Sequence, residues 1–128
     1  TEVVQYQQLA RYVAAFDVGI APIADIPFNR AKSNVKVKEY AAMGVPWLAS
    51  PIGPYADLGE KQGGRLVPDD RWFEELEHLV SDARARKRLA KRGIKWANGQ
   101  RLRRNLGVWE AALQRAIALA GSPVPVAG

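Results

Sequence analysis

The stretch PFNRAKSNVKVKEYAAMGVP, residues 27–46, holds the side chains whose types and spacing could do chemistry. Ser33 and Asn34 are common helix-capping residues, and they stand directly before VKVKEYAAM, a helical pattern that stops at Gly44. The free backbone N–H groups at such a helix start form a site for an anion such as phosphate. We therefore expect the amides of Ser33, Asn34 and Val35, together with the Ser33 hydroxyl, to bind phosphate.

Charged side chains extend this prediction along the same helix. Lys32 and Lys36 could each place a positive charge beside the phosphate. Glu39 follows Asn34 at a spacing of about 7.5 Å along a helix axis, which suits a carboxylate that accepts hydrogen bonds from ribose hydroxyls. The alternative stays open that Ser33 only caps the helix and that Glu39 only pairs with a neighbouring lysine, an interaction of about 0.2–0.5 kcal/mol.

Short apolar runs on either side of this helix predict the strands that must position it. They are DVGIAPI (17–23), PWLAS (46–50) and GGRLVP (63–68), each bounded by proline, glycine or polar residues. Strands that alternate with helices predict an α/β fold with a parallel sheet covered on both faces. About three strands are evident, whereas a complete doubly wound domain has about six. We therefore expect a partial Rossmann-like sheet flanked by helices.

Helical patterns account for most of the remaining chain. QQLARYVAAF predicts a helix with apolar residues at Leu9, Tyr12, Val13 and Phe16. DDRWFEELEHLVSD predicts a second helix with an apolar stripe formed by Trp72, Phe73, Leu76, Leu79 and Val80. From Ala83 to about Ala120 the chain reads as helical, with a break near Asn98-Gly99.

This organisation predicts residues 1–120 as an incomplete domain and residues 121–128 as a flexible tail. Thr1 is not an initiator methionine, so we expect the chain to be part of a longer protein. The open edge of a half sheet favours association, which makes a homodimer or a strand exchange an expected consequence.

The ends of the predicted strands locate a cleft. Ligands of open α/β sheets bind at the carboxyl ends of the strands, and the loop from Ala24 to Lys32 leads from the first strand to the Ser33 helix start. Ser50, Gly53 and Tyr55 follow the second strand and are predicted to border the same cleft. Turn chemistry explains Gly53 equally well.

Composition excludes several other classes of protein. The apolar content of 48% and the charged content of 25% are ordinary for a soluble globular domain, and no apolar run is long enough to span a membrane. The chain has no cysteine, which excludes disulfides and cysteine zinc sites and favours a cytoplasmic protein. The single histidine, His78, is predicted on a polar helix face, so we expect no resident cofactor or metal. Magnesium could still enter together with a diphosphate.

The segment from Phe16 to Leu58, FDVGIAPIADIPFNRAKSNVKVKEYAAMGVPWLASPIGPYADL, combines these features in a distinctive order. An aspartate precedes a strand ending in Ala-Pro, and Pro-Phe-Asn, Ser-x-x-Lys-x-x-Glu-Tyr, Gly-x-Pro and a strand ending in serine follow. The combination resembles the donor-binding C-terminal domain of GT-B fold glycosyltransferases, closest to the family 4 type, also called glycosyl transferases group 1. With the helical part downstream, the resemblance covers residues 16–118.

The resemblance implies that the chain binds a nucleotide-diphosphate sugar. It also implies sugar transfer to an acceptor glycan, lipid or small molecule, with retention of configuration, once the chain is joined to an N-terminal domain that carries the acceptor site and most catalytic groups. No catalytic residue is assigned within this chain, and alone it is expected to be inactive.

The family often has two glutamates separated by seven residues, the first contacting the sugar and the second the ribose. Glu39 matches the second, and Ala31, which cannot accept a hydrogen bond through its side chain, stands at the first. Asp25 is the nearest acid but is out of register. Asp25, Phe28 and Lys32 are therefore only candidate cleft-lining residues.

The net charge of +6 is concentrated in one segment. Residues 84–104 contain ten arginines and lysines and no acidic residue. One interpretation is a solvated helix face with Leu89, Ala90, Ile94 and Ala97 turned inward. Another is peripheral contact with the anionic cytoplasmic face of a membrane. A third is nucleic acid, which the scarcity of aromatic residues in this segment argues against.

Two classes of function remain open from the sequence. The first is the nucleotide-sugar-binding part of a glycosyltransferase. The second is a noncatalytic Rossmann-like module that binds a partner or serves in assembly, which Ala31 and the missing half of the sheet favour.

Overall fold

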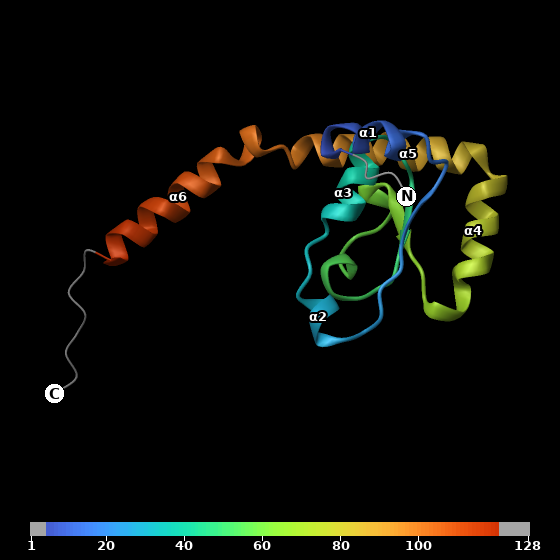
Figure 1. The fold of residues 1–128 in the computed structure, drawn as a ribbon, viewed down its shortest axis with the longest axis horizontal. Coiled ribbons are helices and arrows are strands. Elements are labelled where there is room, and N and C mark those ends of the chain that lie inside the picture. Colours follow the sequence, from blue (N-terminus) through green and yellow to red (C-terminus); the bar gives the residue numbers. More distant parts are fainter. Residues whose placement is uncertain (1–4, 121–128) are drawn as a thin grey trace. The chain divides into compact units, whose positions relative to one another are not determined.

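The computed structural model describes residues 5–120, leaving aside the side chains of residues 6 and 7. Its sheet has three parallel strands in the order β1 (Gly19–Ala21), β2 (Trp47–Ala49) and β3 (Gly64–Leu66) (Figure 1). The predicted fold class is confirmed: the fold is α/β, with a small parallel sheet flanked by helices. All three predicted strands form. The predicted tail, residues 121–128, lies outside the described residues.

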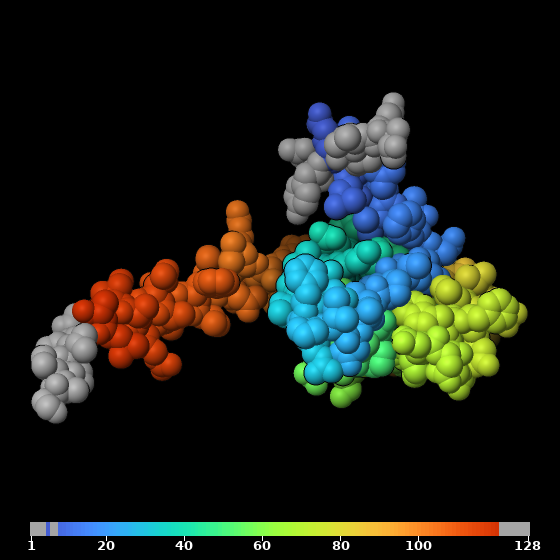
Figure 2. Space-filling model, turned by 60° about the horizontal axis from the view of Figure 1, so that its bottom comes forward, coloured from blue at the N-terminus to red at the C-terminus, as the bar shows by residue number. Residues whose placement is uncertain are grey.

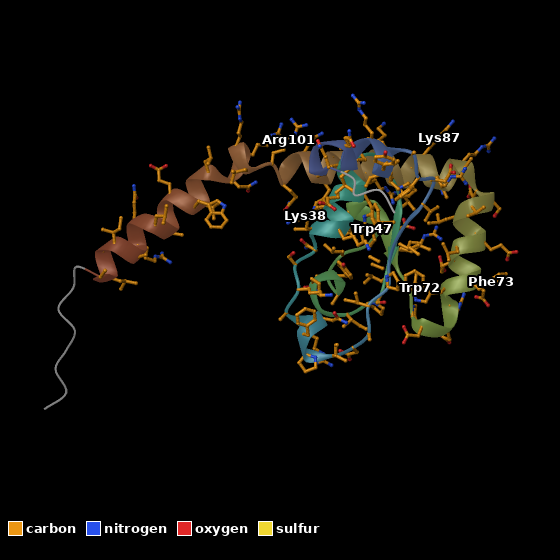
Figure 3. All side chains as sticks on the ribbon, in the orientation of Figure 1. Lys38, Trp47, Trp72, Phe73, Lys87 and Arg101 are labelled. Carbon is orange, nitrogen blue, oxygen red and sulfur yellow. The ribbon has the colours of Figure 1, made fainter. Side chains whose placement is uncertain are left out.

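Helices cover both faces of this sheet. Side chains alternate along β2, so Trp47 and Ala49 join one buried cluster and Leu48 joins the other. The first cluster includes residues of α1 (Tyr6–Ala14) and α3 (Val35–Ala42), and the second includes residues of α4 (Trp72–Ser81) and α5 (Ala83–Gly99). In Figure 3, Trp47 lies in the interior and Trp72 points from α4 toward the sheet, whereas Phe73 points outward.

The helix break predicted near Asn98-Gly99 is confirmed. α5 ends at Gly99, and α6 (Leu102–Ala120) begins three residues later. The chain divides at the same place into two compact units, one ending at Asn98 and the other beginning at Gly99. The sheet and the residues of the predicted cleft all belong to the first unit.

One helix in the first unit was not predicted. Residues 24–32 were expected to form a loop, but α2 (Pro27–Arg30) forms a single helical turn within them, with Pro27 in its first turn. The side-chain amide of Asn29 stabilises this turn by donating a hydrogen bond to the Ala24 carbonyl at 2.9 Å. Gly53 then packs against the backbone of Asn29 and Arg30.

Only part of the apolar stripe predicted for the helix now called α4 is buried. Leu79 is fully buried and Leu76 partly buried on α4, but Phe73 and Val80 are 78% and 62% exposed. The sheet ends at β1, so nothing among residues 5–98 covers this side of α4. Phe16, predicted on the apolar face of the first helix, and Ile20 in β1 lie beside this open edge and are exposed for the same reason.

Three short 3₁₀ turns complete the connections. Gly53–Tyr55 and Glu60–Gln62 lie between β2 and β3, and Asp69–Arg71 precedes α4. The predicted helix stop at Gly44 is confirmed, since Gly44 follows α3 with a φ of +73°, in the left-handed region that favours glycine.

Candidate functional site

A cavity of about 380 Å³ opens at the carboxyl end of β1, against the start of α3. Figure 2 looks toward the surface formed by the segments that follow β1, coloured light blue to cyan. Four of the predicted site residues line this cavity at the helix start, Lys32, Ser33, Val35 and Lys36, and Tyr55 joins them from the turn after β2. The remaining lining residues are Ala21, Pro22 and Ile23.

The start of α3 presents backbone donors that no protein group accepts. The first helical hydrogen bond runs from the Lys38 N–H to the Asn34 carbonyl at 3.2 Å. Among residues 5–120, the N–H groups of Val35, Lys36 and Val37 have no hydrogen-bond acceptor. Three free donors at the positive end of the helix dipole favour an anion.

The predicted side-chain cap of this helix is wrong. Asn34 occupies the cap position, but neither its side chain nor that of Ser33 makes a capping hydrogen bond. Asn34 has a φ of −89° and a ψ of 25°, away from the extended conformation in which a capping side chain usually reaches back to the helix amides. The amides are therefore left for a ligand or for water.

Tyr55 contributes an accessible hydroxyl to the cavity from a side chain that is otherwise buried. The residue is 4% exposed, and its hydroxyl makes no hydrogen bond within the described part of the chain. Burial raises the pKa of Tyr55 above its ordinary value, with a smaller effect from Tyr40. The hydroxyl is therefore neutral at physiological pH and able to donate a hydrogen bond to an anion in the cavity.

Lys32 and Lys36, the two predicted basic residues, differ in their contacts. The Lys32 ammonium lies 4.8 Å from the centroid of the Phe28 ring, a cation–π contact. Phe28 itself is 70% exposed and does not line the cavity, so its part is to position Lys32. Lys36 makes no ion pair with any described residue and is available to a ligand.

Asp25 lies outside the cavity and is already paired. Its two carboxylate oxygens accept hydrogen bonds from the Arg30 guanidinium at 2.5 Å and 2.7 Å. The hydrogen bond from Arg30 lowers the pKa of Asp25, which keeps the carboxylate ionised and paired. Asp25 is thus placed to hold the loop around α2.

Ser50 and Gly53 also lie outside the cavity and have structural contacts. Ser50 is buried, and its hydroxyl accepts a hydrogen bond from the Ile23 N–H at 3.0 Å, which fixes the chain where it leaves β1. Gly53 has a φ of +53°, and a Cβ atom there would come 2.7 Å from the Arg30 Cα. Of the three predicted loop residues, only Tyr55 reaches the cavity.

Glu39 lies on the same helix but borders a different cavity. This second cavity, about 170 Å³ in volume, lies between α1 and α3 and has mostly apolar walls. Glu39 is partly buried, and its carboxylate makes no hydrogen bond or ion pair with any described residue. The alternative that Glu39 pairs with Lys36 or Lys38 is therefore wrong. The remaining residues of this cavity are Leu9, Ala10, Val13, Ala42 and Met43.

Other features of the described residues bear on the nature of the site. Ala31 is exposed at the end of α2. His78 is exposed on α4, with its Nδ1 3.0 Å from the Arg65 guanidinium. Within residues 5–120, no group of three or more metal-ligating side chains comes together. None of the helices described combines the length and the apolar character that a membrane crossing requires.

Comparison with protein-family models, with curated proteins and with solved structures gives no match for this chain. Any functional conclusion must therefore depend on the geometry of the cavity at the start of α3.

Proposed function

We propose that this chain is the nucleotide-diphosphate-sugar-binding part of a GT-B glycosyltransferase of the family 4 type, and that the cavity at the start of α3 holds the diphosphate. One observation carries the proposal: the free amides of Val35 and Lys36, the unpaired Lys36 side chain and the accessible hydroxyl of Tyr55 meet in a single cavity of about 380 Å³. Each of these groups is a hydrogen-bond donor. Their natural ligand is an anion with several acceptor oxygens.

The same groups would serve the chemistry of sugar transfer. When the bond between the sugar and the diphosphate of the donor breaks, negative charge develops on the leaving diphosphate. Donors that are already aimed at that charge stabilise it without a reorganisation cost. The amides of Val35, Lys36 and Val37 and the side chain of Lys36 would supply this stabilisation. The acceptor and the catalytic groups would come from the rest of a longer protein.

Glu39 is the proposed ribose contact. It follows Val35 by one helical turn, about 6 Å along the axis of α3. Its carboxylate is partly buried and has no partner among the described residues, so it is free to accept hydrogen bonds from a ligand. Two ribose hydroxyls would supply them, with the diphosphate lying one turn away at the helix start.

A noncatalytic module remains a second candidate. Ala31, where the family often has a sugar-binding acid, offers no acceptor side chain. In addition, an apolar groove of about 460 Å³ lies beside the free edge of β1, where a partner could bind. This candidate predicts that the chain binds no nucleotide.

Calorimetric titration with UDP, GDP and ADP tests the two candidates against each other. The proposed function predicts heat with at least one diphosphate and a loss of about tenfold or more in affinity for Glu39→Ala, since ribose hydrogen bonds to a carboxylate are charge-assisted. Asp25→Asn, outside both cavities, is the matched control and should bind as the wild type does. The absence of heat with all three nucleotides would favour the noncatalytic module.

A further inference from the structure

α6 is an amphipathic helix whose apolar face is not covered by any described residue of its own unit. Its seven large apolar side chains are between 52% and 71% exposed. At about 100° per residue they cover about half of the helix circumference. Five of them lie within about 80° of one another on the helix: Leu102, Leu106, Trp109, Leu113 and Ile117.

The one polar side chain within the apolar half of α6, Asn105, has its N–H donors paired locally. The Asn105 amide donates hydrogen bonds to the carbonyls of Gly99 and Arg101, each at 3.0 Å. The Asn105 N–H donors therefore do not resist transfer of the apolar face to an apolar environment.

Charge on α6 is distributed around the borders of the apolar face. Arg103 follows one border, and Arg104 and Arg115 follow the other, with Glu110 as the single acidic residue of the helix. Arginines in these positions can keep their guanidinium groups at a polar boundary while the apolar side chains are buried below it. Such an arrangement is typical of a helix that lies in the plane of an anionic lipid surface.

The preceding helix, α5, also carries positive charge. α5 presents Arg84, Lys87, Lys91 and Lys95 along one exposed stripe, and none of them forms an ion pair within residues 5–120. In Figure 3, Lys87 points away from the body of its unit. By contrast, Arg92 is paired with Glu60, and Arg86 donates to the carbonyls of Leu79 and Val80.

We infer that α6 binds the surface of an anionic membrane, with its apolar face in the headgroup region and its arginines among the lipid phosphates. Stable attachment to a membrane takes two signals, and the chain has an apolar helix face and a run of unpaired cations. The inference is independent of the proposed nucleotide site. It depends on α6 for insertion and on α5 only for added electrostatic attraction.

Vesicle flotation with the full chain tests this inference. Vesicles of phosphatidylcholine alone are compared with vesicles that also contain phosphatidylglycerol, at low and at high salt. We expect binding to the anionic vesicles at low salt and little binding to the neutral ones. The double variant Leu106→Ser/Leu113→Ser should reduce partitioning by about tenfold or more, because apolar burial contributes to interfacial binding.

A matched control lies on the opposite face of the same helix. The double variant Ala111→Ser/Gln114→Ser should bind as the wild type does, and circular dichroism should confirm that both variants keep their helical content. Tryptophan fluorescence should shift to the blue when the chain binds vesicles. If this shift disappears in Trp109→Phe, the apolar face lies in the lipid.

Three results would overturn the inference. One is the absence of binding to anionic vesicles at low salt. Another is equal binding by the wild type and Leu106→Ser/Leu113→Ser. The third is a dimer, seen by light scattering, that this variant converts to a monomer without any effect on vesicles, since the apolar face would then belong to a second copy of the chain.

Discussion

The aromatic ring of Tyr40 lies directly against the backbone of Gly19. A Cβ atom on Gly19 would come 2.6 Å from the Cγ and Cδ2 atoms of that ring. The Tyr40 hydroxyl also donates a hydrogen bond to the Ile20 carbonyl at 3.1 Å. Gly19 and Ile20 belong to β1, and Tyr40 lies in the last turns of α3, so this contact packs the C-terminal part of α3 against β1. The contact fixes the helix along the strand and thereby sets where the start of α3 lies relative to the carboxyl end of β1. The candidate diphosphate cavity depends on that placement.

Gly19→Ala should therefore lower the free energy of unfolding. The added methyl group would overlap the Tyr40 ring and force either the ring or β1 to move, at a cost of about 1–3 kcal/mol. Urea denaturation followed by circular dichroism measures the effect. Gly59→Ala is the control, because no atom lies within 4 Å of a Cβ at Gly59 and its φ of 171° is extended backbone. Equal stability of the two variants would contradict the packing described for Tyr40.

The second prediction concerns the two sides of α4. Leu79 is fully buried, so Leu79→Ala should destabilise the protein by about 2–5 kcal/mol. Phe73 is 78% exposed on the same helix, so Phe73→Ala should change stability by about 0.5 kcal/mol or less. Thermal unfolding of both variants distinguishes them. A large loss of stability for Phe73→Ala would mean that the outer side of α4 is covered in solution.

The third prediction concerns pH. The Asp82 carboxylate accepts a hydrogen bond from the Ala85 N–H at 2.8 Å, at the start of α5, and this bond is the largest cause of its lowered pKa. A lowered pKa in the folded state means that the ionised carboxylate stabilises the fold above its unfolded value of about 3.9. Asp82→Ala should thus be less stable than the wild type at neutral pH.

This difference should shrink as the pH falls through the folded-state pKa of Asp82, because the carboxyl group is then protonated in both states. Denaturant unfolding at neutral and at acidic pH measures it. Asp82→Asn keeps an accepting oxygen without the charge, so its stability relative to Asp82→Ala should depend little on pH. A wild-type advantage that persists unchanged in acid would contradict the assigned role.

The sheet could be predicted from the sequence because each strand is a short apolar run with clear boundaries. α2 could not, because a single turn of four residues is too short to show helical periodicity. Its formation depends on the Asn29 hydrogen bond and on the approach of Gly53, a contact between segments far apart in the sequence. The exposure of Phe73 and Val80 could not be predicted either. Helical spacing shows which residues share an apolar face, but not how much of that face packs against the sheet.

The cavity at the start of α3 was predicted in position but not in detail. Lys32, Ser33, Val35 and Lys36 line it as expected, because a strand end followed by a helix start brings them together. Ser50 and Tyr55 could not be distinguished by sequence, as both follow β2. A contact across 27 residues turns the Ser50 hydroxyl to the Ile23 amide, whereas Tyr55 lines the cavity and its hydroxyl stays accessible there.

The most direct test of the proposed function locates the diphosphate by nuclear magnetic resonance. Titration of the ¹⁵N-labelled chain with UDP, GDP or ADP should shift the backbone amides of Val35, Lys36 and Val37 most, because a bound phosphate would accept hydrogen bonds from these free donors. Tyr55→Phe should weaken the same shifts, whereas the amides far from residue 55 should keep their wild-type positions. The absence of shifts at the start of α3 with every nucleotide, or shifts confined to the basic stripe of α5, would contradict the proposal.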